Sequence, residues 1–92
     1  MSKEVVINNQ KYEITQDEKN SFNKEVVEEK LTEYFGDFDI IVGDWAYGKL
    51  RLKGFNNKNN KNFKELNNAD KIGEYIEKYC AYGCKWFQLE KK

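Results

Sequence analysis

The spacing of apolar residues switches between two periods along this chain, and this switch is the feature that most constrains its fold. Between Phe22 and Phe35, apolar side chains recur at steps of three and four residues, with charged side chains on the opposite face. That spacing is typical of an amphipathic helix. Around Leu50 and Leu52, apolar residues alternate with cationic ones, which is the period of a strand with one buried face. The chain therefore combines helices with strands.

The two periods follow one another in the order ββαββαβ. The predicted strands are Lys3–Asn8, Lys11–Gln16, Phe38–Gly43, a strand within Trp45–Phe55, and Lys85–Glu90, and the predicted helices are Phe22–Phe35 and Ala69–Cys80. Asn20 or Ser21 is expected to cap the first helix, and Gly36 to end it. Because most strands follow one another directly, we expect an α+β fold: a mainly antiparallel sheet of about five strands, with two helices covering its apolar face.

The length of 92 residues favours a single domain spanning residues 1–92, since two halves would each bury too small a core. Aromatic residues make up 15% of the chain, which argues against disorder. No apolar run approaches the roughly 20 residues of a membrane-spanning helix. The N-terminus also lacks the apolar segment of a signal peptide. We therefore expect a cytoplasmic protein that does not enter membranes.

Charge is balanced overall but divided unevenly along the sequence. The chain has 16 basic and 16 acidic residues and no histidine. Residues 1–44 hold 5 basic and 11 acidic side chains, whereas residues 45–92 hold 11 basic and 5 acidic ones. Six cations and no acid lie between Lys49 and Lys64. The second half therefore offers a cationic surface, and the opposite charges of the two halves allow a homodimer.

A cationic strand interleaved with aromatic rings predicts a binding surface, because cations pair with phosphates or carboxylates while exposed rings stack or anchor. The predicted binding residues are Asp44, Trp45, Tyr47, Lys49, Arg51, Lys53 and Phe55. Within this set, Arg51 stands out against a lysine-rich background, and Asp44 is its expected partner across a hairpin. We expect a non-catalytic protein-interaction module with a protein partner. Single-stranded nucleic acid, above all RNA, bound through residues 45–64 is the alternative.

The asparagine-rich run Asn56–Asn62 follows this strand and cannot build an apolar core. It is expected to form an exposed, mobile loop of solvated side chains.

Catalysis finds little support in the residue types present. Histidine, the commonest proton shuttle, is absent, and no phosphate-binding or zinc-protease motif occurs. We therefore expect no catalytic residue, metal or cofactor.

Cys80 and Cys84 are spaced C-x-x-x-C rather than C-x-x-C. Free cysteines usually pack as small apolar residues, although a redox or regulatory thiol pair is a second alternative function.

Two stretches resemble a known family. Gly43–Phe55 reads G-D-W-A-Y-G-K-L-R-L-K-G-F, and Tyr75–Leu89 reads Y-I-E-K-Y-C-A-Y-G-C-K-W-F-Q-L. Together they resemble the YutD-like family, small proteins of low-G+C Gram-positive bacteria. The resemblance implies a small intracellular α+β domain. It implies no reaction, cofactor or ligand, and no catalytic residue.

Overall fold

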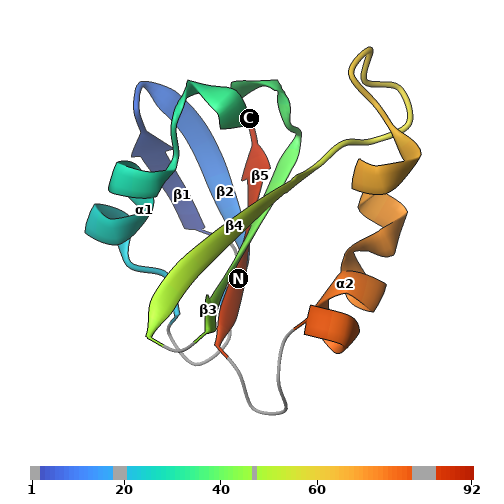
Figure 1. The fold of residues 1–92 in the computed structure, drawn as a ribbon. Helices are drawn as coiled ribbons and strands as arrows, with labels where there is room; N and C mark the ends of the chain where they lie inside the picture. Colours follow the sequence, from blue (N-terminus) through green and yellow to red (C-terminus); the bar gives the residue numbers. More distant parts are fainter. Residues whose placement is uncertain (1–2, 18–20, 47, 80–84) are drawn as a thin grey trace.

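Two apolar layers, one on each face of a five-stranded sheet, organise the fold (Figure 1). The computed structural model describes residues 3–17, 21–46, 48–79 and 85–92. The elements are β1 (Lys3–Ile7), β2 (Gln10–Asp17), α1 (Lys24–Lys30), the 3-10 helix η2 (Glu33–Asp37), β3 (Ile40–Ala46), β4 (Lys49–Phe55), the 3-10 helices η3 (Glu65–Asn67) and η4 (Ala69–Lys71), α2 (Ile72–Tyr79) and β5 (Trp86–Lys91). The α+β prediction and its order of strands and helices are confirmed.

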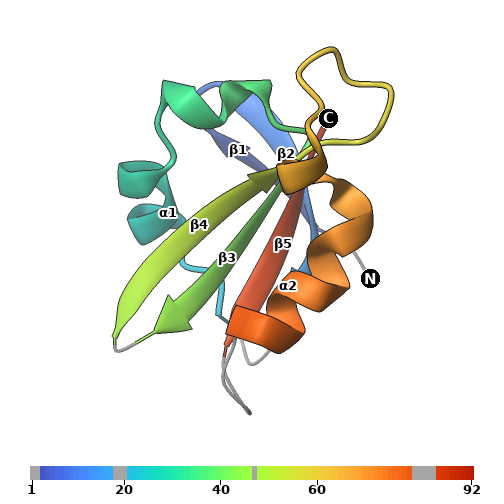
Figure 2. The ribbon, with the colours of Figure 1, turned by 45° about the vertical axis from the view of Figure 1, so that its right-hand side comes forward.

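The sheet has the strand order β1-β2-β5-β3-β4, and every pair of neighbouring strands is antiparallel. β5 therefore lies in the middle, between the β1–β2 and β3–β4 hairpins (Figure 2). The β1–β2 hairpin turns at Asn8 and Asn9, whose φ angles of 50° and 68° are left-handed. Asparagine tolerates that conformation better than most residues, so the turn forms where the sequence predicts it.

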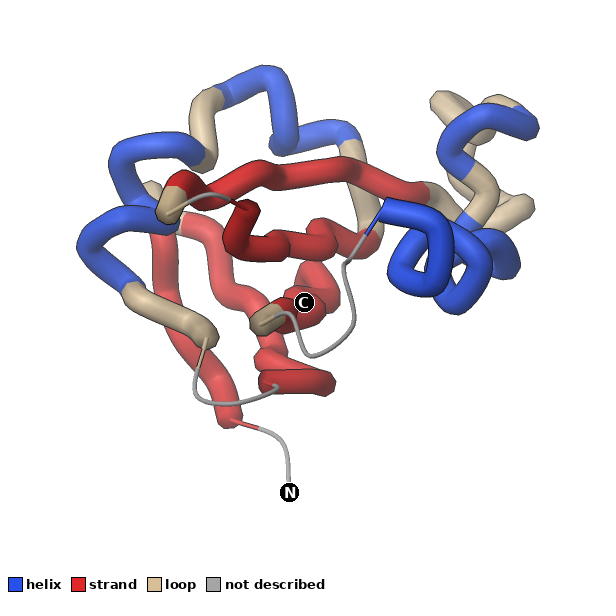
Figure 3. The backbone as a smooth tube through the Cα atoms, turned by 60° about the horizontal axis from the view of Figure 1, so that its bottom comes forward, coloured by secondary structure: helices blue, strands red, loops and turns tan. Residues whose placement is uncertain are grey.

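The first face of the sheet carries the larger core. Alternate residues of the strands, such as Ile41, Leu50 and Phe87, meet Val27 and Leu31 from the α1 region. The second face carries a smaller core, in which Ile40, Val42 and Phe55 pack against α2 residues. The two helices thus lie on opposite sides of the sheet (Figure 3), whereas the sequence suggested that both would cover one apolar face.

The first helix is shorter than the predicted segment Phe22–Phe35. Asn23 caps it, because the Asn23 side chain accepts a hydrogen bond from a backbone N–H of the first turn. Helix α1 ends at Lys30, and the carbonyl oxygen of its C-cap residue Leu31 accepts a 2.6 Å hydrogen bond from the side-chain amide of Asn8. The chain then continues as η2, which contains Gly36. A contact distant in sequence therefore sets this boundary, and local periodicity alone could not reveal it.

The second helical segment corresponds closely to the prediction. Asn68 caps it by accepting a 2.9 Å hydrogen bond from the backbone of Asp70, and a 3-10 turn precedes α2. Cys80, the expected last residue of this helix, lies outside the described residues. Within the described ranges, every helix is too short or too polar to cross a membrane.

Two glycines allow aromatic rings to lie directly on the sheet. A Cβ atom at Gly43 would overlap the ring of Phe87, the residue paired with it on β5. A Cβ atom at Gly54 would likewise overlap the ring of Phe38. The absence of a side chain at these two positions is therefore a packing requirement.

Substitution of Gly43 tests this requirement. Because the added methyl group would overlap the Phe87 ring, we expect Gly43→Ala to lower the free energy of unfolding by about 1–3 kcal/mol. Gly73→Ala is the matched control, since a Cβ atom there meets nothing within 4 Å and Gly73 lies in α2. The control should be neutral or gain up to about 1 kcal/mol. Urea denaturation measures both, and equal stabilities would contradict the packing argument.

Candidate interaction surface

Strand β4 lies at one edge of the sheet and carries most of the predicted binding residues. Its side chains alternate, so that Leu50 and Leu52 join the first core while Lys49, Arg51 and Lys53 lie on the opposite face. Lys49 and Arg51 are exposed, and Lys53 is half-buried. The period-two pattern therefore places three cations in one row, as predicted.

Asp44 and Arg51 form the ion pair that the sequence suggested. They face each other in the β3–β4 register, and the Arg51 guanidinium binds Oδ2 of Asp44. The two partners differ in burial: the Asp44 side chain is 2% exposed and that of Arg51 is 45% exposed. Oδ1 of Asp44 is buried and has no hydrogen-bond partner among the described residues. Asp44 is thus an anchor beneath the surface, and Arg51 is the part that a partner can reach.

The aromatic members of the predicted surface lie elsewhere. Phe55 is 1% exposed and packs edge-on against Tyr75 of α2, with ring centroids 5.6 Å apart. Trp45 is half-buried against the first core, and its indole Nε1 donates a 2.8 Å hydrogen bond to the carbonyl oxygen of Ser21. The prediction of an exposed ring is therefore wrong for Phe55, because its large apolar area is needed in the core. Tyr47 lies outside the described residues.

The asparagine-rich segment after β4 is only partly solvated. Asn56 is 1% exposed, and its side-chain oxygen accepts hydrogen bonds from the backbone N–H of Asp39 at 2.9 Å and from Nδ2 of Asn60 at 3.1 Å. Asn60 also donates to the Asp39 carboxylate, at 3.1 Å. A second buried amide, Asn68, contacts Glu65 and caps the next turn. The prediction of a wholly solvated loop is wrong, because paired amides hold the segment against the sheet.

Leu66, which lies beside these hydrogen-bonded amides, is exposed to solvent. Leu66 in η3 is 85% exposed, the highest exposure of any large apolar residue described. It borders a groove of about 630 Å³ between β4, η2 and the asparagine-rich segment. We call this the Leu66 groove; its apolar lining includes Phe38, Leu52, Phe63 and Leu66, and its cations are Lys53, Lys61 and Lys64. Sequence reasoning missed Leu66, although an isolated leucine within a polar segment was a visible signal.

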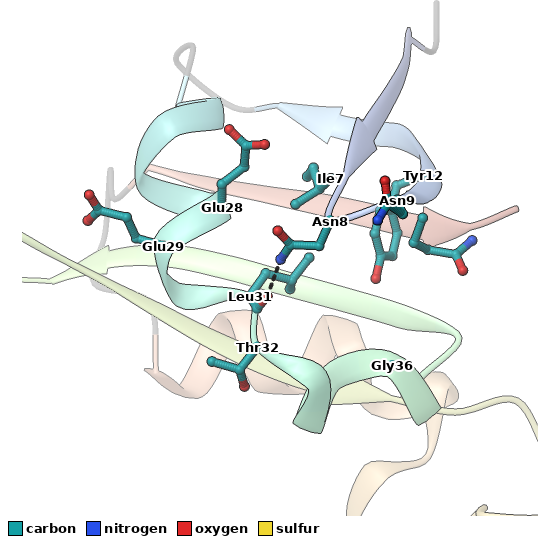
Figure 4. A pocket seen from close by; sticks show the side chains of 10 residues that line it. Ile7, Asn8, Asn9, Tyr12, Glu28, Glu29, Leu31, Thr32 and Gly36 are labelled. Atoms are coloured by element: carbon teal, nitrogen blue, oxygen red, sulfur yellow. Dashed lines mark hydrogen bonds between the residues drawn. The ribbon is translucent and has the colours of Figure 1, made fainter.

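A second hollow of about 760 Å³ lies between the β1–β2 turn and the α1–η2 connection (Figure 4). Asn8 spans it by its hydrogen bond to Leu31, and Glu28 and Glu29 project from α1. Burial raises the pKa of the Tyr12 hydroxyl above its ordinary value. The carboxylates of this hollow belong to the acidic half of the sequence. Among the described residues no three potential ligands gather as a metal site.

These features define a class of small α+β domains in which an antiparallel sheet lies between two helices. A family model described as "Putative antitoxin YutD-like" matches residues 6–90. The Bacillus subtilis (strain 168) protein "Putative antitoxin YutD" is 36% identical over 87 residues, covering 95% of this chain and 96% of that protein. The solution NMR structure of protein yutD from B. subtilis has a TM-score of 0.80 and 34% identity, covering 98% of this chain and 82% of that one. The chain belongs to the YutD-like family.

The Asp44–Arg51 pair can be tested by removing its exposed partner. We expect Arg51→Met to lower the free energy of unfolding by about 2–4 kcal/mol, because it leaves a buried carboxylate unpaired. Half of Arg51 is exposed, which keeps the loss below that of a fully buried pair. The control, Lys49→Met on the same strand face, should change stability by less than about 0.5 kcal/mol. A double-mutant cycle with Asp44→Asn that shows no coupling would contradict the assignment.

Beside the Leu66 groove, Glu65 supplies a pH-dependent contact. A hydrogen bond from Lys71, at 3.2 Å, lowers the pKa of the Glu65 carboxyl, and a hydrogen bond from Asn68 adds to the effect. The stabilisation is therefore present above the ordinary pKa of glutamate and is lost as the pH falls through the lowered value. In an NMR titration, Lys71→Gln should move the Glu65 midpoint upward. Lys78→Gln on α2 should leave it in place, and an unmoved midpoint in Lys71→Gln would refute the contact.

Proposed function

We propose that this protein is a non-catalytic interaction module that binds a partner protein through the cationic row Lys49, Arg51 and Lys53. The word antitoxin in the family description and in the name of the B. subtilis relative supports a protein partner. The observation that carries the proposal is the fixed position of Arg51, whose side chain is 45% exposed while its guanidinium binds a buried carboxylate. A cation held in place before binding loses little conformational freedom on binding, and arginine is enriched at protein interfaces.

The placement of the aromatic rings favours a protein over a nucleic acid. Single-stranded nucleic acids bind where exposed rings stack on the bases. Phe55 is buried and Trp45 packs on the core, so the row of cations has neither ring available as a stacking platform. Phosphate contacts by lysines alone would give weak, salt-dependent binding. The second alternative, a redox role for Cys80 and Cys84, concerns residues outside the described ranges and stays a prediction.

Charge reversal on β4 tests the proposed surface. We expect the double variant Lys49→Glu, Lys53→Glu to lose a protein that the wild-type chain retains in affinity purification from its native cells. The introduced glutamates would carry the same negative charge as an acidic partner surface and would repel it. The control is Lys24→Glu, Lys30→Glu, because both residues are exposed on α1, which packs on the face of the sheet opposite the cationic row. Circular dichroism establishes that both double variants are folded.

Two results would overturn the proposal. The first is a folded β4 variant that retains the same partner as the wild type. The second is salt-dependent binding of short single-stranded RNA, abolished by the β4 substitutions, with no retained protein. That second result would instead support the nucleic-acid alternative.

A further inference from the structure

We infer that the Leu66 groove docks an extended acidic segment of the partner protein, with one apolar side chain of that segment packed against Leu66. This inference rests on the proposed function, since it supplies the chemistry of the partner. It adds a second contact region, on η3 and the asparagine-rich segment, to the cationic row of β4.

The exposure of Leu66 is the first observation. A leucine that is 85% exposed leaves most of its apolar area in water, and burying such a side chain is favourable. Val6 of β1 is the other large apolar residue exposed among those described, at 51%. Val6 is not part of the groove lining, whereas Leu66 stands at the border of a groove with an apolar floor formed by Phe38, Leu52 and Phe63. An exposed apolar side chain beside an apolar groove is suited to anchor a side chain of a binding partner.

The rigidity of η3 is the second observation. The backbone N–H of Asn56 donates to the carbonyl oxygen of Asn67 at 2.7 Å, and the backbone N–H of Lys64 donates to Oδ1 of Asn67 at 2.8 Å. The contact between Asn68 and Glu65 closes the same turn from its other side. Leu66 lies at the centre of these hydrogen bonds and is held outward by them. A preorganised anchor costs less to order on binding than a mobile one.

The charge of the groove is the third observation, and it indicates which kind of molecule the groove binds. Lys53, Lys61 and Lys64 line the groove together with a single acid, Asp37. Lys53 also lies over the Phe55 ring, 5.4 Å from its centroid, which restricts the position of its ammonium group. Three cations around an apolar floor complement a segment that carries carboxylates and an apolar side chain. A nucleic acid would pair with the cations and stack on the phenyl rings, but it would leave the aliphatic side chain of Leu66 without a counterpart.

The probe for this inference is a fluorescein-labelled peptide of about twelve residues in which glutamates surround two leucines. Added to the full ¹⁵N-labelled chain, it should shift the amide resonances of residues 61–67 and of Lys53. Leu66→Ser should weaken peptide binding about tenfold, because a central apolar anchor is lost. The fold should survive, since the Leu66 side chain is outside the core. The matched control is Val6→Ser, which removes the other exposed apolar side chain and should leave the affinity unchanged.

The remaining arms separate the possible occupants. A peptide with serine in place of both leucines should bind about tenfold more weakly, and Lys64→Glu should reduce the affinity of the leucine peptide. No binding of the leucine peptide at millimolar concentration, equal binding by Leu66→Ser, or shifts confined to other residues would overturn the inference. So would a homodimer in sedimentation that Leu66→Ser dissociates and Val6→Ser does not, because the occupant of the groove would then be a second copy.

The native partner distinguishes this inference from the proposed function. If Leu66→Ser retains the partner protein as well as the wild type does, while the β4 double variant loses it, the groove assignment fails and the proposed function stands. If neither the wild type nor Val6→Ser retains any protein, the proposed function itself fails. Loss of the partner in both the β4 double variant and Leu66→Ser supports one continuous interface.

Discussion

The packing of Phe87 against the backbone of Gly43 is the contact on which the rest of the fold depends. Phe87 is fully buried at the centre of the first core, where it also meets Phe22 edge-on with ring centroids 5.3 Å apart. Because β5 pairs with both β2 and β3, this ring fixes the strand that joins the two hairpins. A one-residue shift of β5 would move Phe87 to the other face and expose the core. The register of β5 therefore also determines that Trp86 flanks Asp44.

The motif that carries the family resemblance is largely explained by this packing. Within Gly43–Phe55, Gly43 and Gly54 make room for aromatic rings, Asp44 binds Arg51, and Phe55 belongs to the second core. Arg51 is the member of the motif that is both structurally anchored and accessible from solvent.

The two halves of the sequence, which carry opposite net charge, are mixed in the sheet, because β5 of the basic half lies between β2 and β3 of the acidic half. The strands of the two halves are thus mixed within the sheet, and cations line the β4 edge and the Leu66 groove.

The sequence was informative where a residue's environment follows from its immediate neighbours. Alternation around Leu50 revealed β4 and its cationic row, and the spacing of Asp44 and Arg51 suggested their pairing across a hairpin turn. Prediction failed where distant residues decide the outcome. The first helix ends before Leu31, whose carbonyl oxygen accepts a hydrogen bond from the side-chain amide of Asn8. Phe55 is buried because residues of α2 pack against it. The asparagine-rich segment gave no apolar pattern to follow, so the burial of the Asn56 and Asn68 amides and the high exposure of Leu66 were revealed only by the structure.

The central position of β5 has a consequence for how the chain reaches this fold. Each hairpin joins strands that are neighbours in sequence and can form locally, but the link between the hairpins pairs Ile14 with Leu89. Closing so long a stretch of chain costs entropy before any core contact offsets it. Proteins dominated by such distant pairings fold slowly compared with helical domains of the same size. We therefore expect the slow step of folding to be the pairing of the last strand of the sheet between the two hairpins, and substitutions at Gly43 or Phe87 to act on that step.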